Sequence, residues 1–222
     1  LVLISGPTGS GKSTTLYATL RLLNDVVSNI LTIEDPVEYT LEGVNQVQLK
    51  EEIGLTFTSA LRTFLRQDPD VIMLGEIRDA DTAQMAIRSS LTGHLIFSTI
   101  HTNSAWGSVS RLIDMGVHPY LISDTLILCM AQRLVRLLCP ECKREIEPDE
   151  HAKRLLGADF QSGKLYRAVG CEHCYYTGYS GRKAIYEVIP IDDELAGAIR
   201  TAESEVGHLL EERHDLSADK DH

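Results

Sequence analysis

The chain has 222 residues, of which 43% are hydrophobic and 24% are charged, a composition typical of a folded globular protein. This composition excludes a disordered chain or a collagen-like repeat, and we expect no transmembrane segment because no apolar run is long enough. The net charge is −11, and residues 192–222 alone carry ten acidic and three basic side chains. The acidic balance argues against a nucleic-acid partner. Because the chain opens inside an apolar strand, we expect a fragment that lacks an N-terminal part.

Short apolar segments alternate with helical patterns along most of the chain. We expect strands at residues 1–5, 30–34, 71–76, 95–100 and 133–138, and helices at 12–23, 58–67, 80–91, 104–115 and 119–131. Strands that are apolar on both faces and alternate with helices predict an α/β fold whose mainly parallel sheet is covered on both sides. After Gly181 we expect one more strand, 184–189, and then a helical acidic end.

Residues 6–13 read GPTGSGKS and match the phosphate-binding pattern GxxxxGK[ST], between an expected strand and an expected helix. The glycines let backbone N–H groups surround phosphate oxygens, and the helix N-terminus adds its positive dipole end. Lys12 is expected to reach the β- and γ-phosphates of ATP, and Ser13 to bind Mg²⁺. The predicted nucleotide-binding residues are Gly6, Pro7, Thr8, Gly9, Ser10, Gly11, Lys12, Ser13 and Thr14.

Acidic residues and a histidine follow three of the expected strands at their carboxyl ends, where ligands of such sheets bind. Gly75 occupies the place at which many P-loop ATPases have a Mg²⁺-binding aspartate, so we expect Glu76 to serve the metal or its water. A second carboxylate, Glu38 or Glu34, is expected to activate the attacking water. His101 ends the next strand and is expected to sense the nucleotide.

His94 lies at the other end of the His101 strand, roughly 20 Å away at ~3.3 Å per residue, so we expect a structural role or a subunit contact. Arg62 and Arg66 are four residues apart on one face of the expected helix 58–67. Two interpretations remain open for this pair. The face is solvated, or it contacts a nucleotide bound by a neighbouring subunit.

Four of the five cysteines form two CxxC pairs, separated by 28 residues. Two such turns are the usual way to offer four thiolates to Zn²⁺, and a site closed by four cysteines is structural rather than catalytic. The expected zinc ligands are Cys139, Cys142, Cys171 and Cys174, and the segment between the pairs is expected to hold a helix, 149–157. The fifth, Cys129, lies in an apolar segment and is expected to be a buried thiol.

Several segments together resemble the secretion ATPases of type II secretion and type IV pilus assembly, the GspE/PilB group. GPTGSGKSTTLYATL is similar to their Walker A segment, ILTIEDPVEY to their Asp box, and LRQDPDVIMLGEIRD to their Walker B segment. TGHLIFSTIHTNSA is similar to their His box, and AQRLVRLLCPEC with CEHCYYTGYSGR to the tetracysteine zinc element of the assembly and secretion branches.

This resemblance implies a RecA-like P-loop core at residues 1–138, a zinc element at 139–182, and a C-terminal strand and acidic helical segment at 183–222. It implies a homo-hexameric ATPase on the cytoplasmic face of the inner membrane, which works with an inner-membrane platform protein and a membrane-recruiting partner. Glu38 matches the proposed catalytic carboxylate of the family, Glu76 the Walker B glutamate and His101 the His-box residue.

Arg62 and Arg66 match arginines that precede the Walker B segment in the family. Because the family's main arginine fingers lie on an N-terminal domain that this chain lacks, we expect weak hydrolysis by the chain alone. Two other functions remain as alternatives: a small-molecule P-loop kinase, and a nucleic-acid-binding module built on the cysteine pairs. The motifs are shared between the type II secretion and pilus branches and do not separate them.

Overall fold

The structure is a computed structural model that describes residues 1–156 and 164–201. These residues form two compact units. The first comprises Leu1–Arg133 together with the chain from Tyr186 onward, and the second comprises Leu134–Ile185. Within the described residues, no helix is long and apolar enough to cross a membrane.

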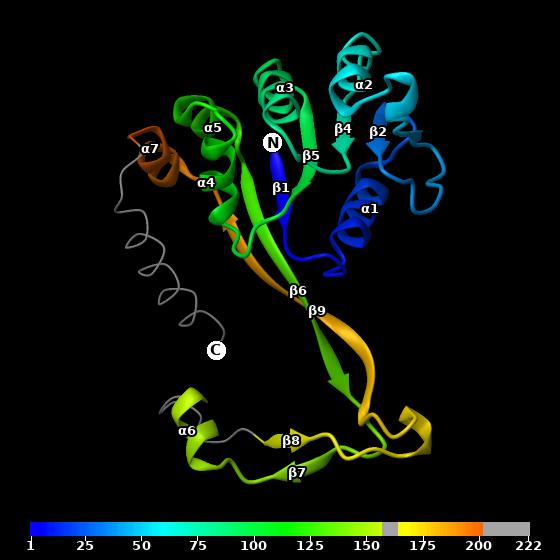
Figure 1. Ribbon diagram of the computed structural model, residues 1–222, viewed down its shortest axis with the longest axis vertical. Helices are drawn as coiled ribbons and strands as arrows, with labels where there is room; N and C mark the ends of the chain where they lie inside the picture. Colours follow the sequence, from blue (N-terminus) through cyan, green and yellow to red (C-terminus); the bar gives the residue numbers. More distant parts are fainter. Residues whose placement is uncertain (157–163, 202–222) are drawn as a thin grey trace. The chain divides into compact units, whose positions relative to one another are not determined.

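A seven-stranded sheet forms the centre of the first unit, in the order β3-β2-β4-β5-β1-β6-β9 (Figure 1). Its strands are β1 (Val2–Ser5), β2 (Ile30–Glu34), β3 (Asn45–Gln48), β4 (Val71–Leu74), β5 (Leu95–Ile100), β6 (Leu128–Leu138) and β9 (Tyr179–Pro190). β1 is parallel to both of its neighbours, β5 and β6, and the pairs β2–β3, β2–β4 and β4–β5 are also parallel. The expected mainly parallel sheet is confirmed, and its carboxyl edge gathers the loops that follow β1, β4 and β5.

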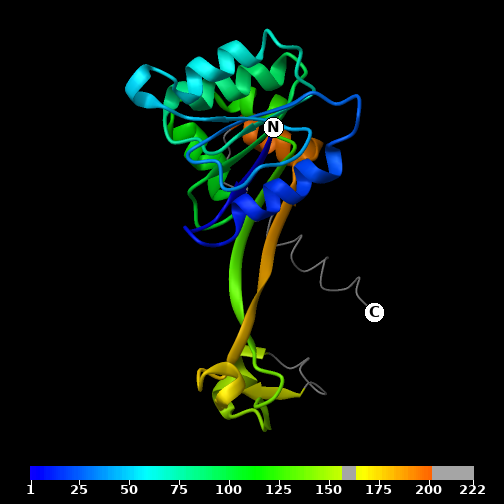
Figure 2. The same ribbon diagram turned by 90° about the vertical axis from the view of Figure 1, so that its right-hand side faces the viewer.

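Both faces of the sheet are buried. Consecutive strand residues point to opposite sides of the sheet, and neighbouring residues here belong to two different hydrophobic clusters. Leu3, Ile33 and Ile72 belong to the larger hydrophobic cluster, whereas their neighbours Ile4 and Met73 belong to a second one. The helices of the larger cluster are α2 (Phe57–Phe64), α3 (Ala80–Leu91), α4 (Gly107–Asp114), α5 (Pro119–Thr125) and α7 (Asp193–Thr201). α1 (Lys12–Leu23) covers the other face, so that the sheet lies between two helical layers (Figure 2).

Local sequence signals set where several helices begin. The hydroxyl of Thr56 accepts from the backbone N–H of Ser59 at the start of α2, and Asp79 accepts from Thr82 at the start of α3. Pro119 occupies the first turn of α5, where its missing N–H costs no hydrogen bond.

The structure corrects three expectations about these elements. The predicted helix 119–131 ends at Thr125, because from Leu128 the chain pairs with β1 and continues as β6. A short apolar segment fits a helix and a central strand equally well, and pairing with β1 decides the outcome. The predicted helix 58–67 ends at Phe64, so Arg66 lies beyond it. β3 was not predicted, since the sequence NQVQ carries the weak pattern of a polar edge strand.

The second unit contains a short antiparallel pair, β7 (Arg144–Ile146) and β8 (Leu165–Arg167), with α6 (Glu150–Leu156) between them in sequence. α6 confirms the helix expected between the two cysteine pairs. The Arg136 guanidinium lies over the Tyr179 ring, 3.8 Å from its centroid. Of the expected acidic helical end, α7 accounts for Asp193–Thr201, and residues 202–222 lie outside the described part of the chain.

Substitution Ile72→Ala tests the packing of the central sheet. Ile72 is fully buried in β4, so removing its side-chain methylene and methyl groups leaves a cavity, and we expect the free energy of unfolding to fall by about 3 kcal/mol. Leu22→Ala is the control, because Leu22 is 87% exposed and should change stability by less than about 0.5 kcal/mol. Urea unfolding, followed by the fluorescence of Trp106, measures the stability of both variants, because Trp106 packs against the same core. Equal losses of unfolding free energy in the two variants would contradict the placement of Ile72 in the core.

Candidate functional site

The loop between β1 and α1 turns tightly through three glycines with positive φ, Gly6 (140°), Gly9 (77°) and Gly11 (87°). A Cβ on Gly6 would lie 2.4 Å from the backbone oxygen of Gln132 on β6, a separation that no side chain tolerates. The loop is therefore held closely against β6, and glycine is required at this position.

Lys12 points back across this loop. Its Nζ donates to the carbonyl oxygens of Gly6 (2.9 Å) and Pro7 (3.1 Å). Burial lowers the pKa of Lys12, and the negative charge of Glu76 acts in the opposite direction. The lysine ammonium and the Glu76 carboxylate therefore lie within electrostatic reach of each other, as expected for groups around a phosphate site.

Gln132 fixes the loop from β6. It is 2% exposed, its Nε2 donates to Ser10 O at 2.7 Å, and its Oε1 accepts from the Thr15 hydroxyl at 2.8 Å. Sequence analysis missed this residue, because a glutamine inside an apolar strand carries no motif. Ser10 Oγ and Arg133 Nη1 are, within the part of the chain described, the buried side-chain polar atoms that lack a hydrogen-bond partner.

Glu76 lies at the centre of a charged cluster that follows β4 and β5. Arg78 Nη2 donates to Glu76 Oε1 at 2.5 Å, and His101 Nε2 lies 3.4 Å from Glu76 Oε2. Arg78 Nη1 is also 3.6 Å from Asp35 Oδ2, beyond the end of β2. The fold thus brings together Glu76 and His101, two residues that the sequence predicts separately for the site, and adds Arg78, which no sequence pattern indicates.

The environment keeps Glu76 charged. Burial by itself raises the pKa of this carboxyl, but the Arg78 hydrogen bond and the charges of Arg78 and His101 outweigh it and lower the pKa below the usual value. The same contact raises the pKa of Arg78. Glu76 is therefore available as an anion at neutral pH, which suits a cation ligand.

His101 also borders an open pocket of about 340 Å³ beside the glycine loop. Its lining combines the start of that loop with the segment after β5: Gly6, Pro7, Thr8, His101, Thr102 and Asn103. Hence β1 and β5, which are neighbours in the sheet, present the phosphate-binding motif and the histidine to the same space.

Glu34, at the end of β2, is 4% exposed and fully engaged. Its carboxylate accepts from the Tyr17 hydroxyl, from Thr32 Oγ1 (2.6 Å) and from Gln46 Nε2 (3.0 Å). Burial together with the Glu34 contact raises the pKa of Tyr17 to about 12, so the phenol stays protonated and donates. The Tyr17 oxygen accepts in turn from the backbone N–H of Glu38 at 3.2 Å, and thereby links the loop after β2 to α1.

Glu38 itself is exposed in that loop, so its side chain is free of the network that holds Glu34. Arg62 on α2 and Arg66 just beyond it are both exposed and belong to no described ion pair. His94 lies at the amino end of β5, the end opposite His101, where its Nδ1 is 3.1 Å from the Ser89 carbonyl oxygen. The structure therefore separates His94 from the site.

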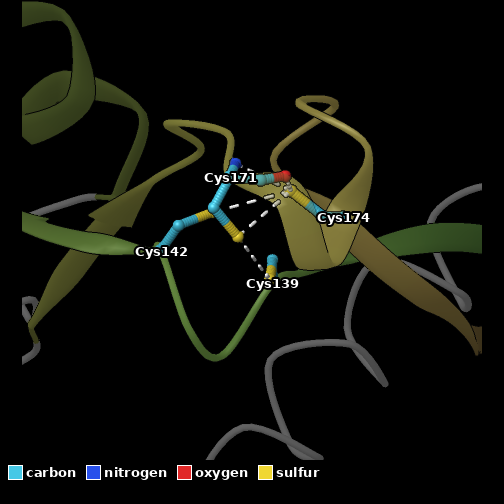
Figure 3. A group of neighbouring side chains, drawn as sticks. All are labelled: Cys139, Cys142, Cys171 and Cys174. Atoms are coloured by element: carbon cyan, nitrogen blue, oxygen red, sulfur yellow. Dashed lines mark hydrogen bonds between the residues drawn. The ribbon is translucent and has the colours of Figure 1, made fainter.

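The four cysteines of the CxxC pairs converge in the second unit (Figure 3). Their sulfur atoms all lie within 4.8 Å of one another, with Cys139–Cys171 at 4.0 Å and both Cys142–Cys174 and Cys171–Cys174 at 3.8 Å. Disulfide sulfurs are about 2 Å apart. Tetrahedral zinc with Zn–S bonds of about 2.3 Å places its sulfur ligands about 3.8 Å apart, so the cluster fits this ion.

Backbone donors support this cluster. Burial disfavours the thiolate of Cys174, but N–H groups of Cys171 (3.2 Å) and Gly178 (3.2 Å) donate to its sulfur and lower its pKa. Cys129, in contrast, is buried in β6 as expected, and burial raises the pKa of its thiol to about 12. Cys174 and Cys129 therefore differ in chemistry as well as in position.

Substitution Tyr17→Phe tests the Glu34 network. It removes the hydroxyl donor and leaves a buried carboxylate with one partner fewer, so we expect the free energy of unfolding to fall by about 2 kcal/mol. Tyr39→Phe is the matched control, since the Tyr39 ring packs edge-on against Tyr17 but is exposed. Denaturant unfolding of the two variants and the wild type measures the difference. Similar stability of Tyr17→Phe and the wild type would show that the network contributes nothing.

Comparison with known proteins agrees with this architecture. The model of the family described as "Type II/IV secretion system protein" matches residues 1–220. Type II secretion system protein E of Pseudomonas aeruginosa is 52% identical over 206 residues, which cover 92% of this chain and 41% of that protein. Type IV pilus assembly ATPase PilB of Myxococcus xanthus is 54% identical over 201 residues, which cover 88% of this chain and 35% of that protein. The chain thus spans less than half the length of these curated relatives.

Among solved structures, the pilus retraction motor PilT with bound ADP is similar, with a TM-score of 0.70 and 30% identity over 96% of this chain and 53% of that one. This likeness confirms the expected RecA-like P-loop core, and the family match confirms the resemblance seen in the sequence. The chain belongs to the type II/IV secretion system protein family.

Proposed function

We propose that this chain is the ATP-hydrolysing motor domain of a hexameric secretion ATPase, which powers pilus or pseudopilus assembly and protein export across the bacterial envelope. One observation carries the proposal: the glycine loop with Lys12, the Glu76 carboxylate and His101 all meet at the carboxyl edge of one parallel sheet. Phosphate is bound at that edge in nucleotide-binding sheets.

In this proposal, the backbone N–H groups of residues 6–14 surround the phosphates, and Lys12 neutralises the charge of the β- and γ-phosphates. Its present contacts with the Gly6 and Pro7 carbonyls hold it at the mouth of the loop. Ser13 and the charged Glu76 would hold Mg²⁺, which supplies a positive charge beside the γ-phosphate. His101 contacts Glu76 and lies beside the loop, which suits it to respond to that phosphate.

We assign the general base to Glu38 rather than Glu34. A base must approach and deprotonate a water molecule, and its carboxylate must be accessible. The Glu34 carboxylate is buried under three donors, whereas Glu38 is exposed in the same loop. Glu34 instead holds Tyr17, whose hydroxyl oxygen anchors the backbone of Glu38.

Arg62 and Arg66 are exposed cations, available to a nucleotide on a neighbouring subunit of a hexamer. An arginine that reaches the γ-phosphate is worth roughly 10³–10⁵ in rate in nucleotide hydrolases. Since we place the main arginine fingers on a domain outside these 222 residues, this chain alone is expected to bind ATP and to hydrolyse it slowly.

For the second unit we propose structural zinc held by the four clustered cysteines. Among the residues of Leu134–Ile185 whose burial the structure describes, the buried ones are Cys139, Cys174 and Gly178, so these residues form almost no apolar core. Four thiolates on one ion supply the missing cross-links. We place this zinc element at residues 139–182, between the core at 1–138 and the C-terminal segment at 183–222.

The same proposal covers location and partners. The full-length protein is a homo-hexamer at the cytoplasmic face of the inner membrane, bound there by a recruiting protein and acting on a membrane platform protein. The names of the relatives include both type II secretion and type IV pilus proteins, which supports a role in one of these two systems without separating the two branches.

Substitutions in the full-length protein test the nucleotide chemistry. Lys12→Ala should weaken ATP binding by at least about tenfold, because it removes a charged contact to phosphate. Glu38→Gln should leave binding and stability unchanged and lower turnover by about a hundredfold or more, since the exposed carboxylate loses only its basicity. Glu34→Gln is the control. It should lower the free energy of unfolding, because the new side-chain NH₂ group is itself a donor and would lie against the buried donors of Thr32 and Gln46. Near wild-type turnover by Glu38→Gln would remove Glu38 from the role of base.

Zinc content tests the second unit. Elemental analysis should give one zinc per chain, and a thiol reagent should modify Cys139, Cys142, Cys171 and Cys174 only after chelation. Cys129 provides an internal control, because it is fully buried in the sheet and should stay unreactive in both states until the chain unfolds. Purified protein with well under one zinc and four reactive, unoxidised thiols would refute the site.

A further inference from the structure

β6 and β9 contribute side chains to the loops around the nucleotide site, although no nucleotide-binding motif of the sequence lies on either strand. Gln132 and Arg133 are adjacent on β6, and Glu187 lies on β9, the neighbouring strand at the edge of the sheet. All three make hydrogen bonds to segments far away in the sequence, at separations of 122, 30 and 82 residues for the contacts to Ser10, Asn103 and Ala105.

Gln132 acts on the phosphate loop. One side-chain amide bridges Ser10 O in the loop and the Thr15 hydroxyl in the first turns of α1, so the loop and its helix are held in a fixed relation. The backbone oxygen of Gln132 lies so close to Gly6 that no Cβ would fit between them. The direction of the loop's N–H groups therefore depends on a buried amide whose hydrogen bonds are all to this segment.

Arg133 and Glu187 act on the second loop, residues 101–106, which carries His101. Arg133 Nη2 donates to Asn103 O at 3.0 Å, and Glu187 Oε2 accepts from the Ala105 backbone N–H at 2.7 Å. One contact holds a carbonyl and the other an N–H two residues later, so the backbone is held from both sides. His101 and Asn103 both line the pocket beside the phosphate loop.

We propose that Gln132, Arg133 and Glu187 are positioning residues of the nucleotide site. Gln132 sets the phosphate loop and so controls nucleotide affinity. Arg133 and Glu187 set the His101 loop and so control turnover, through the geometry of His101 relative to Glu76. This inference rests on the proposed function, but its structural part, that Glu187 fixes the 101–106 loop, stands independently of hydrolysis.

The first experiment separates affinity from turnover in the full-length protein. Gln132→Ala should raise the Kd of a non-hydrolysable ATP analogue about tenfold, because it removes two buried hydrogen bonds from the loop. Glu187→Ala should lower kcat about tenfold and leave that Kd within about twofold. Glu187→Gln should restore kcat, because its amide oxygen accepts the same Ala105 N–H. Lys183→Ala on β9 is the control: it removes an exposed charge from the same strand and should change neither quantity.

The second experiment reads the loop directly. Trp106 is the only tryptophan of this chain and follows Ala105 at the start of α4, so its fluorescence reports on the segment that Glu187 holds. Without nucleotide, Glu187→Ala should shift the Trp106 emission and increase its quenching by acrylamide, whereas Glu187→Gln and Lys183→Ala should match the wild type. If Glu187→Ala does not fold, Glu187→Asp replaces it, since the shorter side chain withdraws the acceptor and should give the same shift.

The outcomes distinguish the two proposals. Unchanged Trp106 emission and unchanged kcat in Glu187→Ala would overturn the positioning role while leaving the hydrolysis of ATP intact. Equal losses of affinity and turnover in both Gln132→Ala and Glu187→Ala would also overturn it, because the effect would then be general. A wild-type protein that neither binds nor hydrolyses ATP would refute the proposed function, and the fluorescence comparison would still decide what Glu187 does.

Discussion

The structure depends on the close contact between the Gly6 backbone and β6. β1 lies between β5 and β6 in the sheet, so the chain that leaves β1 must turn against one neighbour before it can enter α1. Only glycine at position 6 permits this close approach. The Gln132 side-chain amide then donates to Ser10 O and accepts from the Thr15 hydroxyl. With the turn fixed in this way, Gly6, Pro7 and Thr8 line one pocket together with the segment after β5 that begins at His101.

Parallel pairing extends the same constraint across the sheet. The register of β4 with β5 and of β2 with β4 brings the residues after each strand to one edge, which is how Asp35, Glu76 and His101 become neighbours. Arg78 connects these groups, and its positive charge lets carboxylates gather where a phosphate is proposed to bind. Arg78 thus places one positive charge between the Glu76 and Asp35 carboxylates.

The sequence predicted the parts of this site that carry motifs. The glycine loop, the positions of Glu76 and His101 at the carboxyl ends of their strands, and the convergence of the four cysteines follow from spacing, because motif residues keep fixed positions at strand ends and tight turns. The α/β class followed from the alternation of buried strands with helices. The end of α5 could not be predicted from the sequence. The apolar residues Leu126–Ala131 suit a helix as well as a strand, and only pairing with β1 selects the strand.

Three of the missed residues share one physical feature: each acts through a partner at least twelve residues away in the sequence. Gln132, Tyr17 and Gln46 are polar side chains whose role appears only when a buried acceptor or donor lies opposite them. A pattern along the chain cannot show this, because burial of a polar group is determined by tertiary contacts. The same reasoning explains why Glu34, which the sequence could not separate from Glu38, is best understood as a structural carboxylate.

The two units differ in how much hydrophobic core they bury, and the four clustered cysteines lie in the unit that buries less. The first unit buries two hydrophobic clusters on either side of its sheet, whereas the described part of the second buries little beyond two cysteines and a glycine. A segment with so small a core needs cross-links to hold one conformation. The second unit is inserted in the chain between Arg133 and Tyr186, and the two chain crossings lie in β6 and β9. Four thiolates on the proposed zinc would supply those cross-links within the second unit itself.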